Sequence, residues 1–372
     1  MILELEPVTP FIIKTGTKFS ILDLYEDNGE LIRIDTERFV KNLKKEELET
    51  LKNLLDEFIE LKNNSNKKKD GRIIEKYAEE WKKINSFNIK NGAEKYKILP
   101  KMSTDQTFKR YFDFDDFISI EIRGKNGKEL IPYIPGSTIK GMVRRMLMLE
   151  YISKKNKEWF DLNFRSEDLK EMERTLKGVM PLIQISDFYP TGKVEIKLSE
   201  VKRSAPNALP LIYSGKFYGE LNIQSKLRDR ESSLRQFGIE GNTQQMEESL
   251  LGIVLKNSNM IIKKNREWYK DTIYFGPENS NDLIALGYGK GLTLSGFAAV
   301  RNELKLILPD IRSKTRFGNE RTEQKFPKTH WTVKCFNGEK FMDTKLGILR
   351  IRKNNEYDHL KEIKEIVKEV IQ

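Results

Sequence analysis

The stretch between residues 117 and 151 changes from strand-like to helix-like spacing of its apolar residues, and this change limits the possible folds most strongly. From Phe117 to Arg123, apolar and polar residues alternate as in a half-buried strand. The Asn126-Gly127 pair accepts the positive φ of a hairpin turn, and a return strand is predicted from Leu130 to Ile134. A helix is predicted from Thr138 to about Tyr151.

The rest of the chain repeats this mixture of strands and helices. Residues 3–24 predict two short strands, and the Asn- and Lys-rich residues 63–71 predict an exposed loop between two helices, the second with Trp81 on its apolar face. Further helices are predicted over residues 41–61, 72–84, 166–177, 243–262 and 360–370, and further strands over 183–188, 194–201 and 211–224. Intermixed strands, helices and hairpins favour an α+β fold over a doubly wound sheet.

Charge and residue counts narrow the possible functions. The 372 residues hold 67 Lys and Arg against 56 Asp and Glu, which leaves a net charge of +11 and favours a polyanionic partner such as RNA or DNA. The single cysteine, Cys335, excludes an intrachain disulfide framework and a Cys-based zinc finger, and two histidines nearly exclude a multi-histidine metal site. No apolar run reaches the roughly 18 residues of a membrane-spanning helix, so we expect a cytoplasmic protein without a membrane partner.

The first candidate ligand-binding segment lies at the predicted strand-to-helix junction of residues 134–145. Ser137 follows a Pro-Gly turn and is predicted to cap the helix. A buried stripe is predicted from Ile139, Met142, Val143 and Met146. The other face carries a helix end, two cations and a glycine that allows close backbone approach, which together suit a phosphate: Ser137, Lys140, Gly141 and Arg144. The adjacent Arg145 is a further candidate RNA-binding residue. An ordinary capped helix with solvated basic residues is the alternative.

A second segment alternates three glycines after an apolar run. Gly287, Gly289 and Gly291 enclose Lys290, and such a loop can pass close to an RNA backbone. The segment is not a Walker A loop, because Gly291 stands where Ser or Thr is required, and its spacing is not that of a dinucleotide fingerprint. A tight structural turn is an equal alternative.

These two motifs resemble hallmarks of the RAMP superfamily of CRISPR-associated RNA-binding proteins. Within it, the chain is most similar to the family of fifth subunits of the type III-A Csm effector complex. The segments that carry this similarity, besides the two motifs, are Lys18-Phe19-Ser20-Ile21-Leu22-Asp23-Leu24, Ile32-Arg33-Ile34-Asp35 and Phe326-Pro327-Lys328-Thr329-His330-Trp331. The family usually opens with Thr-Pro-Val-His-Ile-Gly, whereas Thr9-Pro10-Phe11-Ile12-Ile13-Lys14 lacks that histidine and glycine.

The resemblance implies a ferredoxin-like (RRM-type) core and a second, more degenerate half with helical insertions. We expect a first half at residues 1–203, with a helical insertion at about 38–105, and a second half at 204–372 with the glycine loop and a terminal amphipathic helix. The implied role is a non-catalytic CRISPR RNA-binding subunit that caps the filament at the three-prime end of the RNA and supports its maturation. The implied partners are CRISPR RNA and other Csm subunits, especially the stalk RAMP subunits, with a trimming nuclease as a further candidate and no cofactor.

Two other functional classes stay open. A RAMP-type, metal-independent endoribonuclease that processes CRISPR RNA would need a histidine acid or base, and the candidates are His330 and His359. The cluster Asp113, Asp115 and Asp116 could hold magnesium, although its alternation with phenylalanines is more typical of a strand edge or turn. A DNA-binding module is a further alternative, but the sequence shows no helix-turn-helix or leucine-zipper pattern. The aromatic and basic cluster around Arg316 suits single-stranded RNA, or is a solvated loop.

Overall fold

The structure is a computed structural model of the chain. It describes residues 1–65, 71–104, 113–124, 127–155, 166–201, 207–224, 231–269, 273–287, 332–336 and 341–354. The α-helices are α1 (Thr36–Lys41), α2 (Lys45–Ser65), α3 (Gly71–Lys90), α4 (Gly136–Lys155), α5 (Ser166–Val179), α6 (Glu231–Arg235) and α7 (Thr243–Tyr269). The strands are β1 (Ile2–Pro7), β2 (Lys14–Ser20), β3 (Leu24–Asp27), β4 (Glu30–Ile34), β5 (Lys97–Thr104), β6 (Asp113–Phe117), β7 (Ser119–Gly124), β8 (Gly127–Pro132), β9 (Ile183–Ile185), β10 (Tyr189–Val201), β11 (Asn207–Ile223), β12 (Ile273–Tyr274), β13 (Leu283–Ala285), β14 (Thr332–Phe336), β15 (Phe341–Lys345) and β16 (Ile348–Lys353).

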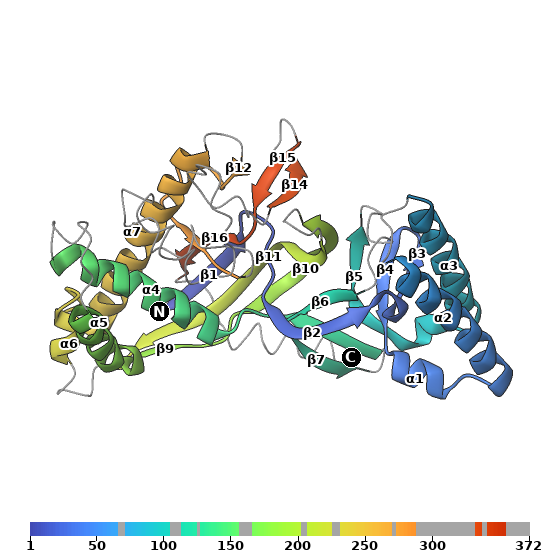
Figure 1. The fold of residues 1–372 in the computed structure, drawn as a ribbon. Helices are drawn as coiled ribbons and strands as arrows, with labels where there is room; N and C mark the ends of the chain where they lie inside the picture. The colour runs from blue at the N-terminus through green and yellow to red at the C-terminus, as the bar shows by residue number, and fades with distance from the viewer. Residues whose placement is uncertain are drawn as a thin grey trace.

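One large mixed sheet runs through the described part of the molecule. Its main path is β13-β16-β1-β11-β10-β5-β4-β3, with the β7–β8 hairpin joined through β5 and β9 joined through β11. Helices α2 and α3 lie at one end of this sheet, and α4, α5 and α7 lie at the other, with the long strands β10 and β11 reaching between them (Figure 1). The two groups of helices are therefore connected through one continuous hydrogen-bonded sheet.

Strand β10 shows why these residues form this sheet. Val194, Ile196 and Leu198 are buried, whereas Glu195 between them is exposed. This alternation places one row of apolar side chains in the core and the polar row outside. The adjacent β11 buries Leu209, Leu211 and Phe217 against the same core. Burial of this apolar surface is the main source of stability for the shared sheet.

The helices also bury one apolar face in the core. Trp81 of α3 is 1% exposed and belongs to the main core with Phe58 of α2, which confirms the predicted apolar face. In α4, all four residues of the predicted stripe are at most 3% exposed: Ile139, Met142, Val143 and Met146. Helix α4 also contacts α7, because Asn257 donates from Nδ2 to the Met146 carbonyl at 3.1 Å.

The α+β class predicted from the sequence is confirmed, whereas several predicted elements begin, end or divide at other residues in the structure. Residues 63–65 continue α2 and do not begin the predicted loop, of which residues 66–70 lie outside the described part. The strand predicted from Phe117 to Arg123 is divided between β6 and β7, because Ile118 donates its N–H to Ile13 instead of to a sheet neighbour. Helix α4 begins at Gly136, two residues before the predicted start. The ferredoxin-like arrangement and the division at residue 203 stay predictions.

No helix in the described ranges is long and apolar enough to cross a membrane. The Asp113–Asp116 cluster lies in β6, as expected for a strand. Asp115 forms an ion pair with Lys14, and Asp116 accepts both Arg33 hydrogen bonds, at 2.9 and 3.0 Å. Within the described residues, no group of three His, Cys, Asp or Glu side chains is arranged to hold a metal ion. These carboxylates join β6 to β2 and β4.

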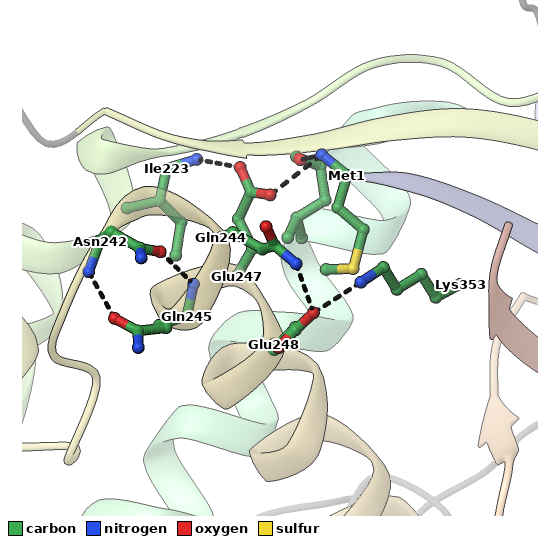
Figure 2. Close-up of polar contacts among 9 residues, drawn as sticks. Met1, Ile223, Asn242, Gln244, Gln245, Glu247, Glu248 and Lys353 are labelled. Carbon is green, nitrogen blue, oxygen red and sulfur yellow. Dashed lines mark hydrogen bonds and ion pairs between the residues drawn. The ribbon is translucent and has the colours of Figure 1, made fainter. Parts of the chain in front are cut away.

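The start of α7 is tied to the sheet by adjacent glutamates (Figure 2). The Glu247 carboxylate accepts hydrogen bonds from the Met1 amino group at 3.0 Å and from the Ile223 N–H at 3.4 Å. The amino group and the carboxylate are both almost fully buried. The neighbouring Glu248 forms an ion pair with Lys353 at the surface. Before them, Asn242 and Gln245 exchange backbone-to-side-chain hydrogen bonds in a capping box. Helix α7 is therefore held against β1 and β11 by a buried ion pair.

Glu247→Ala should destabilise the protein by about 3 kcal/mol, because it removes the counterion of the buried Met1 amino group, which keeps only the Leu221 carbonyl, and the acceptor of the Ile223 N–H. Glu248→Ala is the matched control and should leave the melting temperature nearly unchanged, because its ion pair is solvated. Thermal melting monitored by circular dichroism measures both. Equal effects of the two substitutions would contradict the assigned role of the buried pair.

Candidate nucleic-acid interface

The backbone between β8 and α4 is fixed by a second segment of the chain. Ile134 and Phe188 exchange two backbone hydrogen bonds, of 2.9 and 2.8 Å, in an isolated antiparallel bridge. Gly136 then lies directly against the 185–186 backbone, where an added Cβ would come within 2.2 Å of the Ile185 carbonyl oxygen. Only glycine permits this approach. The close contact sets the point at which α4 begins and its direction.

The N-terminus of α4 is capped from outside the helix. Gly136 donates its N–H to Oδ1 of Asp187 at 2.8 Å, and the Tyr189 hydroxyl donates to the other carboxylate oxygen at 3.5 Å. The prediction that Ser137 is the capping residue is therefore wrong, because Ser137 lies inside the first turn and a residue distant in sequence supplies the carboxylate. Asp187 also places negative charge at the helix end, which disfavours a phosphate at that end.

The favourable position for an anion lies one turn further along the helix. Ser137, Gly141 and Arg144 are exposed, and Lys140 is half-buried beside them. Helix α5 runs alongside, and the two helices enclose a groove of about 340 Å³. We call this the α4–α5 groove, and its lining residues are Lys140, Gly141, Arg144, Leu176, Lys177 and Met180.

The α4–α5 groove carries three cations and little opposing charge. The one carboxylate paired with them among the described residues is Glu173, which lies 3.9 Å from Arg144 with both side chains about half exposed. Such an exposed, long ion pair contributes little free energy, so a phosphate can replace it at small cost. Lys140 and Lys177 have no carboxylate partner in the described ranges. The groove therefore presents unneutralised positive charge over an apolar floor of Leu176 and Met180.

Arg145 differs from its neighbour Arg144. Its guanidinium is partly buried, with Nε directed to the Gly141 carbonyl at 3.4 Å, and burial lowers the pKa of Arg145 from its usual value. Arginine stays protonated at neutral pH despite such a shift. No carboxylate in the described residues forms an ion pair with it, so Arg145 adds to the positive charge of α4.

Gly141 has no structural reason to be glycine. It lies inside a helix, is exposed, and a Cβ built on it meets no atom within 4 Å. Glycine in a helix interior costs about 0.5–1 kcal/mol relative to alanine. A ligand that approaches the helix backbone closely would explain the residue, and Lys140 and Arg144 flank this position.

The glycine segment at residue 287 is described only at its start. Gly287 has a φ of +79°, and a Cβ there would lie 2.7 Å from the Ile12 carbonyl oxygen. Gly287 therefore fulfils the structural alternative, a tight turn packed against the segment between β1 and β2. Gly289, Lys290, Gly291, Arg316, His330 and His359 lie outside the described residues, so their roles stay predictions.

Sequence reasoning missed two residues of this interface. Lys177 ends the predicted helix at residues 166–177, but nothing in the sequence places that helix beside α4. Asp187 follows a strand and is 51 residues from the amide that it caps. The roles of Lys177 and Asp187 both depend on tertiary contacts between separate elements, and no local sequence pattern predicts them.

Comparisons with known proteins identify the family and the fold of the chain. The RAMP superfamily model matches residues 121–370, which is more than half of the chain. No curated protein matches the chain in sequence. Among solved structures, a chain in the "Cryo-EM structure of Csm-crRNA-target RNA ternary complex in type III-A CRISPR-Cas system" aligns with 94% of this chain and 99% of its own length, at a TM-score of 0.59 and 16% identity.

A second solved structure, the crystal structure of T. onnurineus Csm5, covers 93% of this chain and 99% of its own at a TM-score of 0.49 and 16% identity; at this score the alignment supports no conclusion. The family match is sufficient by itself: the chain belongs to the RAMP superfamily. The first alignment adds that the fold extends over nearly the whole length of a chain in a Csm assembly.

Gly136→Ala should lower the melting temperature, because the new Cβ would collide with backbone atoms that cannot move aside. The matched control is Gly252→Ala in α7, where the glycine is exposed and a Cβ meets no atom within 4 Å. That change should raise stability by about 0.5–1 kcal/mol through helix propensity. A stabilising effect at Gly136 would contradict the close approach to the 185–186 backbone.

Proposed function

We propose that this protein is an RNA-binding subunit of a type III CRISPR effector complex and holds the backbone of CRISPR RNA along the α4–α5 groove. The observation that carries the proposal is the set of three cations Lys140, Arg144 and Lys177 around an exposed helix glycine, opposed among the described residues by one long, exposed ion pair between Arg144 and Glu173. Membership of the RAMP superfamily supports RNA as the polyanion. The groove presents charge and apolar surface without an array of base-reading side chains, which favours backbone contacts over sequence readout.

The finer role follows the resemblance found in the sequence. The subunit would belong to a type III-A Csm complex, cap the filament at the three-prime end of the CRISPR RNA and support its maturation. Its partners would be CRISPR RNA, the stalk RAMP subunits and, as a further candidate, a trimming nuclease. The similar chain comes from a Csm complex with CRISPR RNA and target RNA, which supports CRISPR RNA and Csm subunits as partners. Within this proposal, the ferredoxin-like halves divide near residue 203.

The proposal assigns the subunit a non-catalytic role, and an endoribonuclease is the competing function. Incubation of the pure chain with labelled single-stranded RNA, with and without magnesium, separates the two. Intact RNA in both arms is the expected result. Cleavage that disappears on His330→Ala alone would establish the nuclease function instead.

Replacing Lys140, Arg144 and Lys177 together by alanine should weaken RNA binding at least tenfold at low salt. Each lost phosphate contact lowers the slope of log affinity against log salt by about 0.7 for a single strand, so the slope should decrease by about 2. Fluorescence anisotropy with an unstructured labelled RNA, between 50 and 200 mM salt, measures both quantities.

The control for this triple variant removes the same charge elsewhere. Lys52, Lys76 and Lys82 are exposed on α2 and α3, and their alanine triple variant should bind RNA nearly as the parent does. If both triple variants lose equal affinity, binding follows total charge and the groove has no special role.

Gly141→Ala should separate folding from binding. It should stabilise the protein by about 0.5–1 kcal/mol, as Gly252→Ala does, because nothing opposes a Cβ there. It should also weaken RNA binding, because the Cβ occupies the space in which the backbone of the RNA approaches. Gly252→Ala should leave RNA affinity unchanged. Parent-like RNA binding by Gly141→Ala would refute close approach at this residue.

A further inference from the structure

A second cleft in the described part of the protein lies away from the α4–α5 groove, between β8 and β10. It has a volume of about 920 Å³, and its walls include residues 129–132 of β8 and residues 190 and 192–196 of β10. Its floor includes Pro100 and Lys101 of β5. None of these residues belongs to the proposed RNA site.

The cleft exists because the sheet divides along one edge of β5. Ile98 and Leu99 pair with β8 in parallel, and residues 102–104 pair with β10 in parallel. Strand β4 occupies the other edge, so β8 and β10 share one edge and separate at Pro100 and Lys101. Pro100 has no N–H to donate, so it suits the point where pairing stops.

Both walls of the cleft are strand edges. Strand β8 is paired along its length with β7, but on the side of β5 its pairing ends at Glu129. Strand β10 pairs with β11 on one side, and on the side of β5 its pairing begins only at Ile196. Within the described residues, the facing edges of residues 130–132 and 190–195 have no strand partner. Unpaired edges of this kind are templates for an added strand.

The side chains of the cleft add apolar surface and a carboxylate without a counterion. Leu130, Ile131, Val194 and Ile196 contribute the apolar part. Glu30 is paired with Lys101 at 2.7 Å, and Glu195 accepts Ser214 at 3.3 Å. Glu129 is partly buried, makes no hydrogen bond or ion pair among the described residues, and burial raises its pKa. Such a carboxylate is stabilised by a cation brought in by a partner.

We propose that the cleft between β8 and β10 receives an extended segment of another protein subunit, which pairs with the free strand edges and brings a Lys or Arg side chain to Glu129. This proposal rests on the proposed function, since it requires an assembly. The occupant is a protein because strand edges and apolar side chains match an extended peptide, and because the three glutamates of the lining outnumber its two lysines, Lys101 and Lys193. The protein then uses separate surfaces for RNA and for its neighbour.

Site-specific photocross-linking in the assembled complex, purified from the host through a tag on this chain, tests the proposal. The probe is p-benzoylphenylalanine, placed at Leu130 in the cleft or, as control, at Leu48 on the exposed face of α2. The probe at Leu130 should cross-link to one short segment of another subunit with alternating apolar residues and a Lys or Arg. The probe at Leu48 should give no product with that segment.

Charge reversal then tests the contact with Glu129. Glu129→Lys should reduce incorporation of the chain into the complex at least tenfold, and changing the cross-linked cation to Glu should restore it. Glu49→Lys, at an exposed position of α2, is the matched control and should incorporate normally. If Glu129→Lys lowers the melting temperature, Glu129→Gln replaces it, with the same direction of effect expected.

The outcomes separate this inference from the proposed function. Cross-links from Leu130 to RNA, to a second copy of this chain, to a segment without a cation or to nothing would overturn the inference while the chain still co-purifies with RNA and other subunits. A chain that purifies without RNA or other subunits would overturn the proposed function itself, and the inference with it.

Discussion

The contact between Gly136 and the 185–187 backbone is the constraint on which the candidate site depends. The Ile134–Phe188 bridge, the missing side chain at Gly136 and the carboxylate of Asp187 together bring β8, β9 and α4 to one point. Helix α4 leaves this point in one direction only, and its buried stripe then packs on the core and on α7. The opposite face is left exposed beside α5. The position of the α4–α5 groove therefore follows from a backbone contact that only glycine allows.

The electrostatics of this junction decide where an anion can bind. A helix N-terminus is a common phosphate site, but here the chain's own Asp187 occupies it. The cations that remain without strong partners are further along α4 and on α5, where Glu173 provides only a long, exposed ion pair. The β8–β10 cleft, in which three glutamates face two lysines, lies elsewhere on the sheet, so the proposed surfaces for RNA and for protein are separated in space.

Local sequence patterns predicted much of this architecture. The apolar stripe of residues 139–146 depends only on which side chains face the core, and the structure confirms it. The capping role of Ser137 was wrong because the true acceptor, Asp187, reaches α4 through tertiary folding. Lys177 could not be assigned for the same reason, since the packing of α5 on α4 joins distant segments. For Gly287, the sequence could not distinguish a tight turn packed on the chain itself from a close approach of RNA, because both require glycine. The structure places Gly287 against the Ile12 carbonyl, which is the first case.

The central claim is that RNA lies in the α4–α5 groove, and ultraviolet cross-linking of the chain to 4-thiouridine-substituted RNA, followed by peptide mass spectrometry, tests it most directly. The account predicts cross-linked peptides that contain residues 136–145 or 173–180. Cross-links confined to α2 and α3, or to the β8–β10 cleft, would contradict it.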